Sequence, residues 1–313
     1  NAGNILSLNQ ERGIRASYVW DRGQNNPIAK VLNAWPSEIA FNNFEDDQDD
    51  RWGLNGSQST VSHSGEFSRK IYQAIDENSP RWGPEYEISL NLKRHMVRGS
   101  LGTYVLSCWI KMQSSSVSSG LGKARMVLTT VNEQGVITPD PSTTGYANYN
   151  SYTCGSNDGA WHYYEIELDL DALSMQLQDF YPLKLKAQVF NTSTELSMYV
   201  DDVRLFPSDA KMTAFTNKPL IGPTSISDEN SRPLHFGYDD FGRLVTKSDF
   251  RKHLISSYEY HFAEDQSDNN YVAVSELQTQ FDPYQNNLAD IAHFDNTQKN
   301  KKIQYYDGIG RDL

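Results

Sequence analysis

The sequence predicts an all-β protein, and three observations support this fold class. Hydrophobic residues make up only 38% of the 313 residues, while aromatic residues reach 12%. The mean hydropathy is −0.64. Such a chain buries its surface through a few large amphipathic rings, and Tyr, Trp, Thr and Val suit a half-buried pleated surface. Segments of alternating polar and apolar residues also recur along its middle, which is the period of strands with one buried face.

The first strands are expected near the N-terminus. Gly13–Trp20 and Ile28–Val31 are rich in β-formers and flank the turn-rich stretch Asp21–Pro27. Two short strands around such a turn predict a β-hairpin. The texture of the sequence changes after Pro36, so we place a domain boundary there and assign residues 1–36 to a separate pair of strands.

The longest alternating region runs from Ser37 to Pro207. Clear period-2 alternation covers residues 67–73, 86–92, 104–111, 162–170 and 183–189. Spacers rich in Gly, Asn, Ser and Pro separate these segments. The count is about eight to ten strands over roughly 170 residues, which is typical of a two-sheet sandwich. The one short helix we expect is Asp171–Gln178.

The C-terminal region, residues 208–313, has a different pattern. Tyr238-Asp239-Asp240-Phe241-Gly242-Arg243 recurs loosely as Tyr306-Asp307-Gly308-Ile309-Gly310-Arg311, with aromatic segments between the two copies. In each copy, Tyr would end a strand, Asp would bind the turn backbone, Gly would supply a positive φ, and Arg would begin the return strand beside the Asp. Aromatic residues recur about every 20 residues, which indicates a repetitive strand–turn array.

Charge and composition exclude several classes of function. The net charge is −12 and the isoelectric point is near 5.0, whereas a nucleic-acid partner requires a basic face. There is no run of 18 apolar residues that would span a membrane, and no signal peptide. The sequence begins and ends as if cut from a longer polypeptide, so we expect a fragment.

Sulfur and histidine chemistry offer little. The two cysteines, Cys108 and Cys154, have no zinc-type spacing, and either a disulfide between them or two thiols is compatible with the sequence. The seven histidines form no HExxH motif, and no GxSxG, P-loop or GxGxxG motif occurs. Paired carboxylates such as Glu165 and Glu167 suggest a glycoside hydrolase, but glycoside hydrolysis needs two carboxylates that face each other across a cleft. We therefore predict a non-catalytic protein.

Two family resemblances follow from these motifs. The Tyr-Asp-x-x-Gly-Arg units at 238–243 and 306–311 resemble the Rhs/YD-repeat family, whose β-sheets curl into a hollow shell. The segments Ser17–Trp20 and Pro27–Val31, and the approach to the first unit from Asp228, are similar to strands of YD-repeat surface proteins of the Bacteroidetes type. Residues 37–207 resemble the galactose-binding-like jelly roll of carbohydrate-binding modules. The pieces that carry this second resemblance are Phe41–Glu45, Ser64–Ser68, Tyr104–Lys111 and Tyr199–Leu205.

The jelly-roll resemblance implies a structural calcium ion that ties the first and last strands together. Carried onto this sequence, its ligands are Glu45, Asp201 and the backbone around Ser64 and Gly65. A hard cation takes oxygen ligands from several chain segments, so it would clip distant strands. The alternative is that Glu45 and Asp201 are ordinary carboxylates at the rim of the sandwich.

The candidate sugar-binding residues lie on two strands. Trp109 shares a polar strand face with Ser107 and Lys111, and Tyr163 shares a face with Trp161 and Glu165. If these strands are neighbours, an aromatic and polar surface results; the alternative is that Trp109 belongs to the core. Trp52 and Trp82 lie in loop-like segments. They could bind sugar from these loops, or they could pack over the edge of the sandwich.

The expected function is that of a secreted or cell-surface bacterial module. It would bind glycan, or serve adhesion, from a larger YD-repeat polypeptide. The alternative is a structural shell segment that encloses or displays a toxin or other cargo and binds no sugar.

Overall fold

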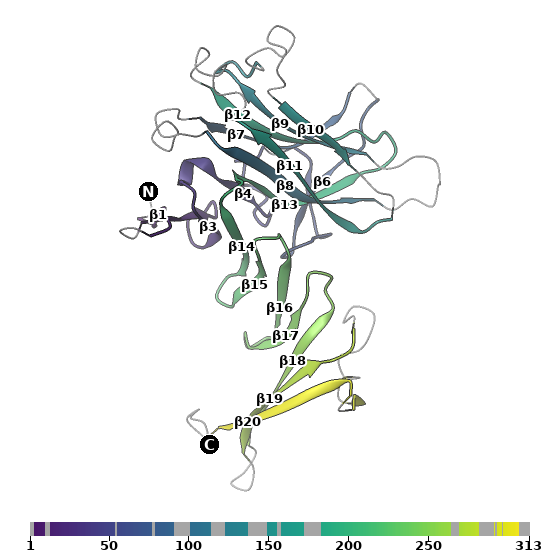
Figure 1. The fold of residues 1–313 in the computed structure, drawn as a ribbon. Helices are drawn as coiled ribbons and strands as arrows, with labels where there is room; N and C mark the ends of the chain where they lie inside the picture. Colours follow the sequence, from purple (N-terminus) through teal and green to yellow (C-terminus); the bar gives the residue numbers. More distant parts are fainter. Residues whose placement is uncertain are drawn as a thin grey trace. The chain divides into compact units, whose positions relative to one another are not determined.

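The computed structural model confirms an all-β protein built from antiparallel strands (Figure 1). It describes residues 3–9, 13–53, 55–76, 79–90, 101–113, 123–136, 149–154, 158–171, 183–263, 269–281, 291, 293–295 and 297–306. The predicted helix at Asp171–Gln178 lies almost wholly outside these residues, as do the side chain of Cys154 and residues 307–311 of the second Tyr-Asp unit.

The chain divides into two compact units, Asn1–Ala214 and Phe215–Leu313. The first unit therefore includes residues 1–36 together with the predicted sandwich. The strands of the first unit are β1 (Ser7–Leu8), β2 (Ala16–Trp20), β3 (Pro27–Leu32), β4 (Ala40–Asn42), β5 (Ser57–Ser59), β6 (Ser68–Ile71), β7 (Arg81–Ser89), β8 (Thr103–Met112), β9 (Ala124–Val131), β10 (Tyr149–Cys154), β11 (Trp161–Asp169), β12 (Lys184–Asn191) and β13 (Met198–Pro207). The 3-10 helix η1 (Pro36–Glu38) precedes β4.

Two sheets form the sandwich of unit 1. One has the strand order β10-β9-β12-β7, and the other has the order β11-β8-β13-β6-β5, with β4 also paired to β13. Figure 1 shows these sheets stacked face to face. The core between them is filled by the inward-facing residues of the alternating segments. On β8 these are Tyr104, Leu106, Cys108, Ile110 and Met112, so the period-2 pattern correctly predicted which residues face the core. The residues between them, Val105, Ser107 and Trp109, are buried as well, on the outer face of the sheet.

A second apolar cluster in unit 1 lies on the outer face of the six-stranded sheet. The predicted N-terminal hairpin forms as β2 and β3, and β3 pairs with β14 (Lys211–Lys218) at Lys211–Ala214. Ile28 and Val31 of β3 and Met212 of β14 belong to one buried cluster with Val105 of β8 and Phe206 of β13. This cluster covers one end of the outer face of that sheet.

Unit 2 is an antiparallel meander. Its strands after the end of β14 are β15 (Gly222–Ser227), β16 (Pro233–Tyr238), β17 (Leu244–Ser248), β18 (Leu254–His261), β19 (Asn270–Leu277) and β20 (Lys299–Tyr306), and each pairs with the next. Its buried apolar cluster contains Leu254, Phe281 and Ile291.

The first Tyr-Asp unit has the predicted turn geometry. Tyr238 is the last residue of β16, and the Asp239 Oδ1 atom accepts hydrogen bonds from the amides of Phe241 (3.0 Å) and Arg243 (2.9 Å). Gly242 has φ +74°, and the Arg243 guanidinium lies 2.7 Å from the Asp239 carboxylate. The tight turn is thus capped by one aspartate and closed by one ion pair.

The same aspartate cap recurs at two other turns of the meander. Asp228 and Asp249 each accept the amides two and four residues later, at distances of 2.8 to 2.9 Å. The residues corresponding to Gly242, Ser231 and Lys252, have φ +61° and +66°. The repeat is therefore a repeat of turn chemistry, with glycine at only one of the three left-handed positions.

Candidate functional site

The open part of the outer face of the β11-β8-β13-β6 sheet carries the predicted sugar-binding residues. Directly opposite residues of an antiparallel pair point to the same face. Trp161 is opposite Lys111, Tyr163 is opposite Trp109, and Glu165 is opposite Ser107. The condition stated from the sequence, that these two strands are neighbours, is confirmed, and all five predicted residues lie together.

The Tyr163 hydroxyl is held by the Glu165 carboxylate, to which it donates a hydrogen bond at 2.8 Å. Burial raises the pKa of Tyr163 to about 12, with a decrease from the neighbouring Ser107 hydroxyl and a further increase from Glu165. The hydroxyl is thus a fixed donor at neutral pH, which leaves Glu165, exposed on the surface, as an oriented acceptor.

His63 joins this face and was missed from the sequence. Its ring stacks on Trp109 with centroids 3.8 Å apart and meets the edge of Trp161 at 5.7 Å. Trp109 is only 7% exposed and lies outside the sandwich core, on the outer face. It therefore supports the half-buried rings of Trp161 and Tyr163. His63 is remote in sequence and has no strand pattern, so no local signal indicated it.

A row of residues crosses the sheet in register from Trp161. Lys111 is opposite Tyr199 of β13, and Tyr199 is opposite Lys70 of β6. The Lys70 ammonium lies 5.7 Å from the ring centre of Tyr199 and 5.4 Å from that of Tyr72. We call Trp161, Lys111, Tyr199, Lys70 and Tyr72 the aromatic–lysine row. Each of the five is at least partly exposed. Lys70, Tyr72 and Tyr199 were not predicted as site residues.

The predicted calcium ligands surround one turn beside this face. The Asp201 carboxylate accepts the amides of His63 (2.8 Å) and Ser64 (3.1 Å), and it also accepts the Asp202 amide. Gly65 has φ +57° in the same turn, which favours glycine there. The Glu45 carboxylate accepts the amides of Glu66 and Phe67, both at 2.9 Å. The structure therefore brings all four predicted residues to one place.

Asp202 is the second acidic residue at this turn. It has φ +50° at a register shift of β13 and is 1% exposed. Although burial alone would raise the pKa of Asp202, the hydrogen bond and charge of His63, together with Arg204, lower it. The His63 Nδ1 atom is 3.2 Å from the Asp202 Oδ2 atom, so His63 connects the acidic turn to the aromatic face.

Glu45 and Asp201 lack a comparable positive neighbour. Burial raises the pKa of Glu45 to about 7, more than its backbone hydrogen bonds lower it, and Glu66 and Asp202 raise it further. Burial, Asp202 and Glu45 raise the pKa of Asp201 well above its usual range. A cation would relieve this repulsion, so the donor set suits a hard ion. Within the described ranges, no group of three His, Cys, Asp or Glu side chains could hold a metal, so backbone oxygens would complete the ligands.

The two loop tryptophans differ. Trp52 is completely buried and packs against Tyr86 with ring centroids 5.0 Å apart, so it is a core residue. Trp82 lies on β7, not in a loop, and is 51% exposed beside Phe190. The described part of the chain contains no helix with the length and apolarity that crossing a bilayer requires.

Comparison with known proteins gives similarity of fold alone. No protein-family model matches the sequence, and no curated protein matches it. Among solved structures, the chain is similar to TmCBM61 in complex with β-1,4-galactotriose (12% identity, 57% of this chain and 88% of that chain, TM-score 0.27). It is also similar to the CBM22-1 xylan-binding domain of Paenibacillus barcinonensis Xyn10C (10%, 48% and 79%, TM-score 0.30).

A third similar structure is the K3 cleaved adhesin domain of Lys-gingipain from Porphyromonas gingivalis (15% identity, 55% of this chain and 92% of that chain, TM-score 0.27). At these identities and TM-scores, the likeness carries no argument about the ligand.

Proposed function

We propose that this chain is a non-catalytic, extracellular glycan-binding module whose ligand lies along the aromatic–lysine row. The observation that carries the proposal is the register of the row: Trp161, Lys111, Tyr199 and Lys70 follow one another across one open sheet face. Tyr72 lies two residues beyond Lys70, just past the end of β6. Neighbouring strands are about 4.8 Å apart, so Trp161 and Tyr199, separated by β8, are about 10 Å apart. Two rings so placed suit an extended chain of sugar rings.

The chemistry of the row matches a polysaccharide. Aromatic rings accept the apolar face of a sugar, and Lys111 and Glu165 provide a hydrogen-bond donor and an acceptor for its hydroxyls. Trp109 and His63, stacked beneath, position the rings and are not themselves exposed enough to bind. Strands of a packed sandwich hold these groups in place, which lowers the ordering cost of binding.

Glycan-array screening of the full chain, followed by affinity electrophoresis with the best polysaccharide, tests the proposal. Trp161→Ala and Tyr199→Ala should each weaken binding by roughly tenfold or more, because hot-spot aromatic contacts are worth about 2 kcal/mol. Trp82→Ala, which removes an exposed tryptophan from the other sheet, is the matched control and should leave retention unchanged. Absence of any bound glycan, or equal losses in all three variants, would overturn the proposal.

We also propose that a structural calcium ion binds at the turn of Ser64 and Gly65, with Glu45 and Asp201 as its carboxylate ligands. The support is the pair of buried carboxylates with raised pKa values described above. An ion bound only by the folded state raises the melting temperature by mass action. The melting temperature of the full chain should therefore fall when a chelator is added. If the melting temperature is the same in chelator as in excess Ca²⁺, the chain binds no structural calcium ion.

A larger bacterial cell-surface protein of the YD-repeat, Bacteroidetes type is the proposed setting of this module. The aspartate-capped turns at Asp228, Asp239 and Asp249 support a repeat array in unit 2. They also favour the second candidate function, a structural shell segment that displays cargo without binding sugar. The glycan array separates the two functions. If the chain is only a structural segment, no glycan binds, and Trp161→Ala changes nothing in the array.

A further inference from the structure

A polar cavity of about 540 Å³ lies in unit 1 at the end of the six-stranded sheet where β8 begins and β13 ends. Its volume falls within the range of about 300–1,000 Å³ that is usual for small-molecule sites. Thr103, in its wall, is six residues from Trp109 along β8. At about 3.3 Å per residue this is roughly 20 Å, so the cavity is separate from the aromatic–lysine row.

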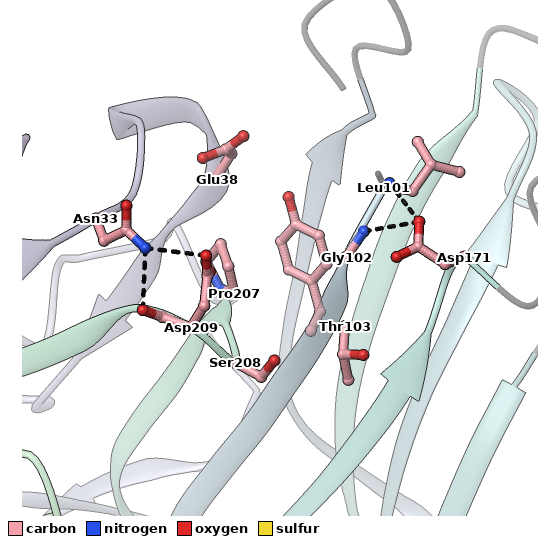
Figure 2. Close-up of a pocket in the computed structure, with 10 residues that line it drawn as sticks. Asn33, Glu38, Leu101, Gly102, Thr103, Asp171, Pro207, Ser208 and Asp209 are labelled. Atoms are coloured by element: carbon pink, nitrogen blue, oxygen red, sulfur yellow. Dashed lines mark hydrogen bonds between the residues drawn. The ribbon is translucent and has the colours of Figure 1, made fainter. Parts of the chain in front are cut away.

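The walls of the cavity are joined by hydrogen bonds between distant segments. The Asn33 side-chain amide donates to the Asp209 carbonyl (3.1 Å) and carboxylate (2.9 Å). The Ser208 amide donates to the Thr103 carbonyl at 2.8 Å. In Figure 2, Asn33 and Asp209 lie on one side of the cavity and Asp171 on the other. These bonds form the cavity before any ligand arrives, which reduces the ordering cost of binding.

Asp171 and Glu38, two further lining residues of the cavity, are also fixed by hydrogen bonds from backbone amides. The Asp171 carboxylate accepts the amides of Leu101 and Gly102, the latter at 3.1 Å. Glu38 is only 5% exposed, and its Oε2 atom accepts the Trp35 amide at 2.8 Å. A buried carboxylate in a cavity wall, anchored by a backbone amide, is a fixed hydrogen-bond acceptor.

The lining chemistry is rich in acceptors and hydroxyls. Carboxylates come from Glu38, Asp171 and Asp209, and none of the ten described lining residues is Lys, Arg or His. Hydroxyl side chains come from Thr103, Tyr104 and Ser208. Such a lining repels anions, and it offers charge-assisted hydrogen bonds to ligand hydroxyls.

We propose that this cavity is a second ligand site, which binds a neutral, hydroxyl-rich small molecule such as a terminal monosaccharide. Sugar hydroxyls donate to the carboxylates and accept from the hydroxyls of Thr103 and Ser208. An ammonium ligand would also be attracted by the carboxylates, but it has no acceptor for these donors. A uronic acid is excluded by repulsion from Glu38, Asp171 and Asp209. The proposal is independent of the aromatic–lysine row.

Amide NMR titration of the full chain with methyl β-galactoside, methyl β-glucoside and methyl β-xyloside tests this proposal. At least one sugar should shift the amides of Leu101, Gly102 and Ser208 in a saturable way. Glu38→Gln should weaken that binding by roughly tenfold, because a charge-assisted acceptor is lost. Ser208→Trp, at an exposed position, should fill the cavity and abolish binding. Glu133→Gln, an exposed acid outside the cavity, is the matched control.

Two further titrations decide between ligand classes. Galacturonate should cause no shift at these amides, and agmatine should bind more weakly than the best sugar. No saturable shift with any of the three sugars, or tighter binding of agmatine or galacturonate, would overturn the proposal. Trp161→Ala should leave the cavity shifts unchanged, so failure of the aromatic–lysine row and failure of the cavity are told apart.

Discussion

The sandwich of unit 1 and the meander of unit 2 are both antiparallel β-structure, but different interactions stabilise them. In the sandwich, completely buried side chains such as Leu106, Leu128 and Leu185 meet between two sheets. In the described part of the meander, the apolar cluster around Leu254 has only Phe281 and Ile291 as further buried members. The recurring contacts there are aspartate caps and ion pairs at turns. The comparison teaches that one unit depends on long-range packing and the other on local turn chemistry.

The two units also differ in what they leave exposed. At turns of the meander, Leu220 and Phe241 are 107% and 84% exposed. The Arg243 guanidinium lies 5.2 Å from the ring centre of Phe241, 4.7 Å from that of Tyr260 and 5.2 Å from that of Phe262. The open face of the sandwich instead alternates rings with lysines. The most exposed aromatic ring in the described part of the meander, Phe241, therefore lies at a turn, whereas Trp161 and Tyr199 of the sandwich lie on a strand face.

The largest expected effect tests whether packing stabilises the sandwich. Leu106→Ala removes a fully buried side chain from its core and should cost about 2–5 kcal/mol of unfolding free energy. All six tryptophans lie in residues 1–214, so tryptophan fluorescence in a urea titration reports on this unit alone. Leu8→Ala, at a half-exposed position, is the control and should change the value by less than about 0.5 kcal/mol. Equal effects would contradict the comparison.

The next effect is a pH dependence confined to the sandwich. The pKa of Glu45 is about 7 in the folded state, against 4.5 as its ordinary value. Between pH 4.5 and 7 the folded state keeps the Glu45 proton that the unfolded state has lost, so the free energy of unfolding falls as pH rises. Above about pH 7 both states have lost this proton, and the stabilisation that the protonated carboxyl gave is gone. In chelator, the loss should reach up to about 3 kcal/mol.

Urea titrations followed by tryptophan fluorescence at a series of pH values measure this loss. Glu45→Gln should flatten the profile, although Asp201 contributes with the same sign. The exposed variant Glu133→Gln should leave the profile unchanged. Added Ca²⁺ should also reduce the slope, because bound cation favours the ionised carboxylates. If the free energy of unfolding in chelator rises from pH 5 to 7, burial does not raise the pKa of Glu45.

A smaller effect tests the turn chemistry of the meander. Gly242→Ala forces a side chain onto a backbone with φ +74°, which should cost about 1–2 kcal/mol. Hydrogen exchange should show lost protection at Arg243 and Asp239, which are bonded across this turn, while the fluorescence transition stays unchanged. Lys252→Gly, at the corresponding position of the next turn, should have the opposite sign. Two effects of the same sign would show that the left-handed positions are not equivalent.

The smallest effect concerns two tyrosines near the ends of strands of the meander, Tyr238 of β16 and Tyr260 of β18. The Tyr260 hydroxyl donates to the Leu244 carbonyl at 2.8 Å, and the Tyr238 hydroxyl donates to the Pro223 carbonyl at 2.8 Å. Tyr260→Phe should cost about 1 kcal/mol, the value of a typical hydrogen bond, as measured by exchange of amides in β17 and β18. Tyr258→Phe, for which no such bond is described, should have no effect.

The features that could be predicted from the sequence are those that depend on interactions between residues close together in the chain. The alternation at 104–111 and 162–170 predicted two strands and the side chains that each turns toward the core, because side-chain direction in a strand depends only on position in the chain. The turn at Asp239 was predicted in atomic terms because its donors and acceptors lie within four residues. Trp161 and Tyr163 were placed correctly because their strand pairs with the one that carries Trp109.

Other parts of the site required the fold. His63, Asp202 and Tyr199 lie far from Trp161 in sequence, and nothing local marks them as its neighbours. Trp109 looked like a surface ring from its polar strand face, but His63 covers it. Likewise, the N-terminal hairpin was predicted, but not that it packs over Val105 and Phe206.

The sequence by itself therefore determined the β class, the strands, the turns and the face on which each strand residue lies, since these depend on neighbours within a few residues. Only the tertiary structure decided which distant strands pair, such as β13 with β4 and β6. It also decided which part of the outer sheet face stays open and how the acidic turn meets the aromatic face. Those choices depend on the packing of distant segments, which no local pattern encodes.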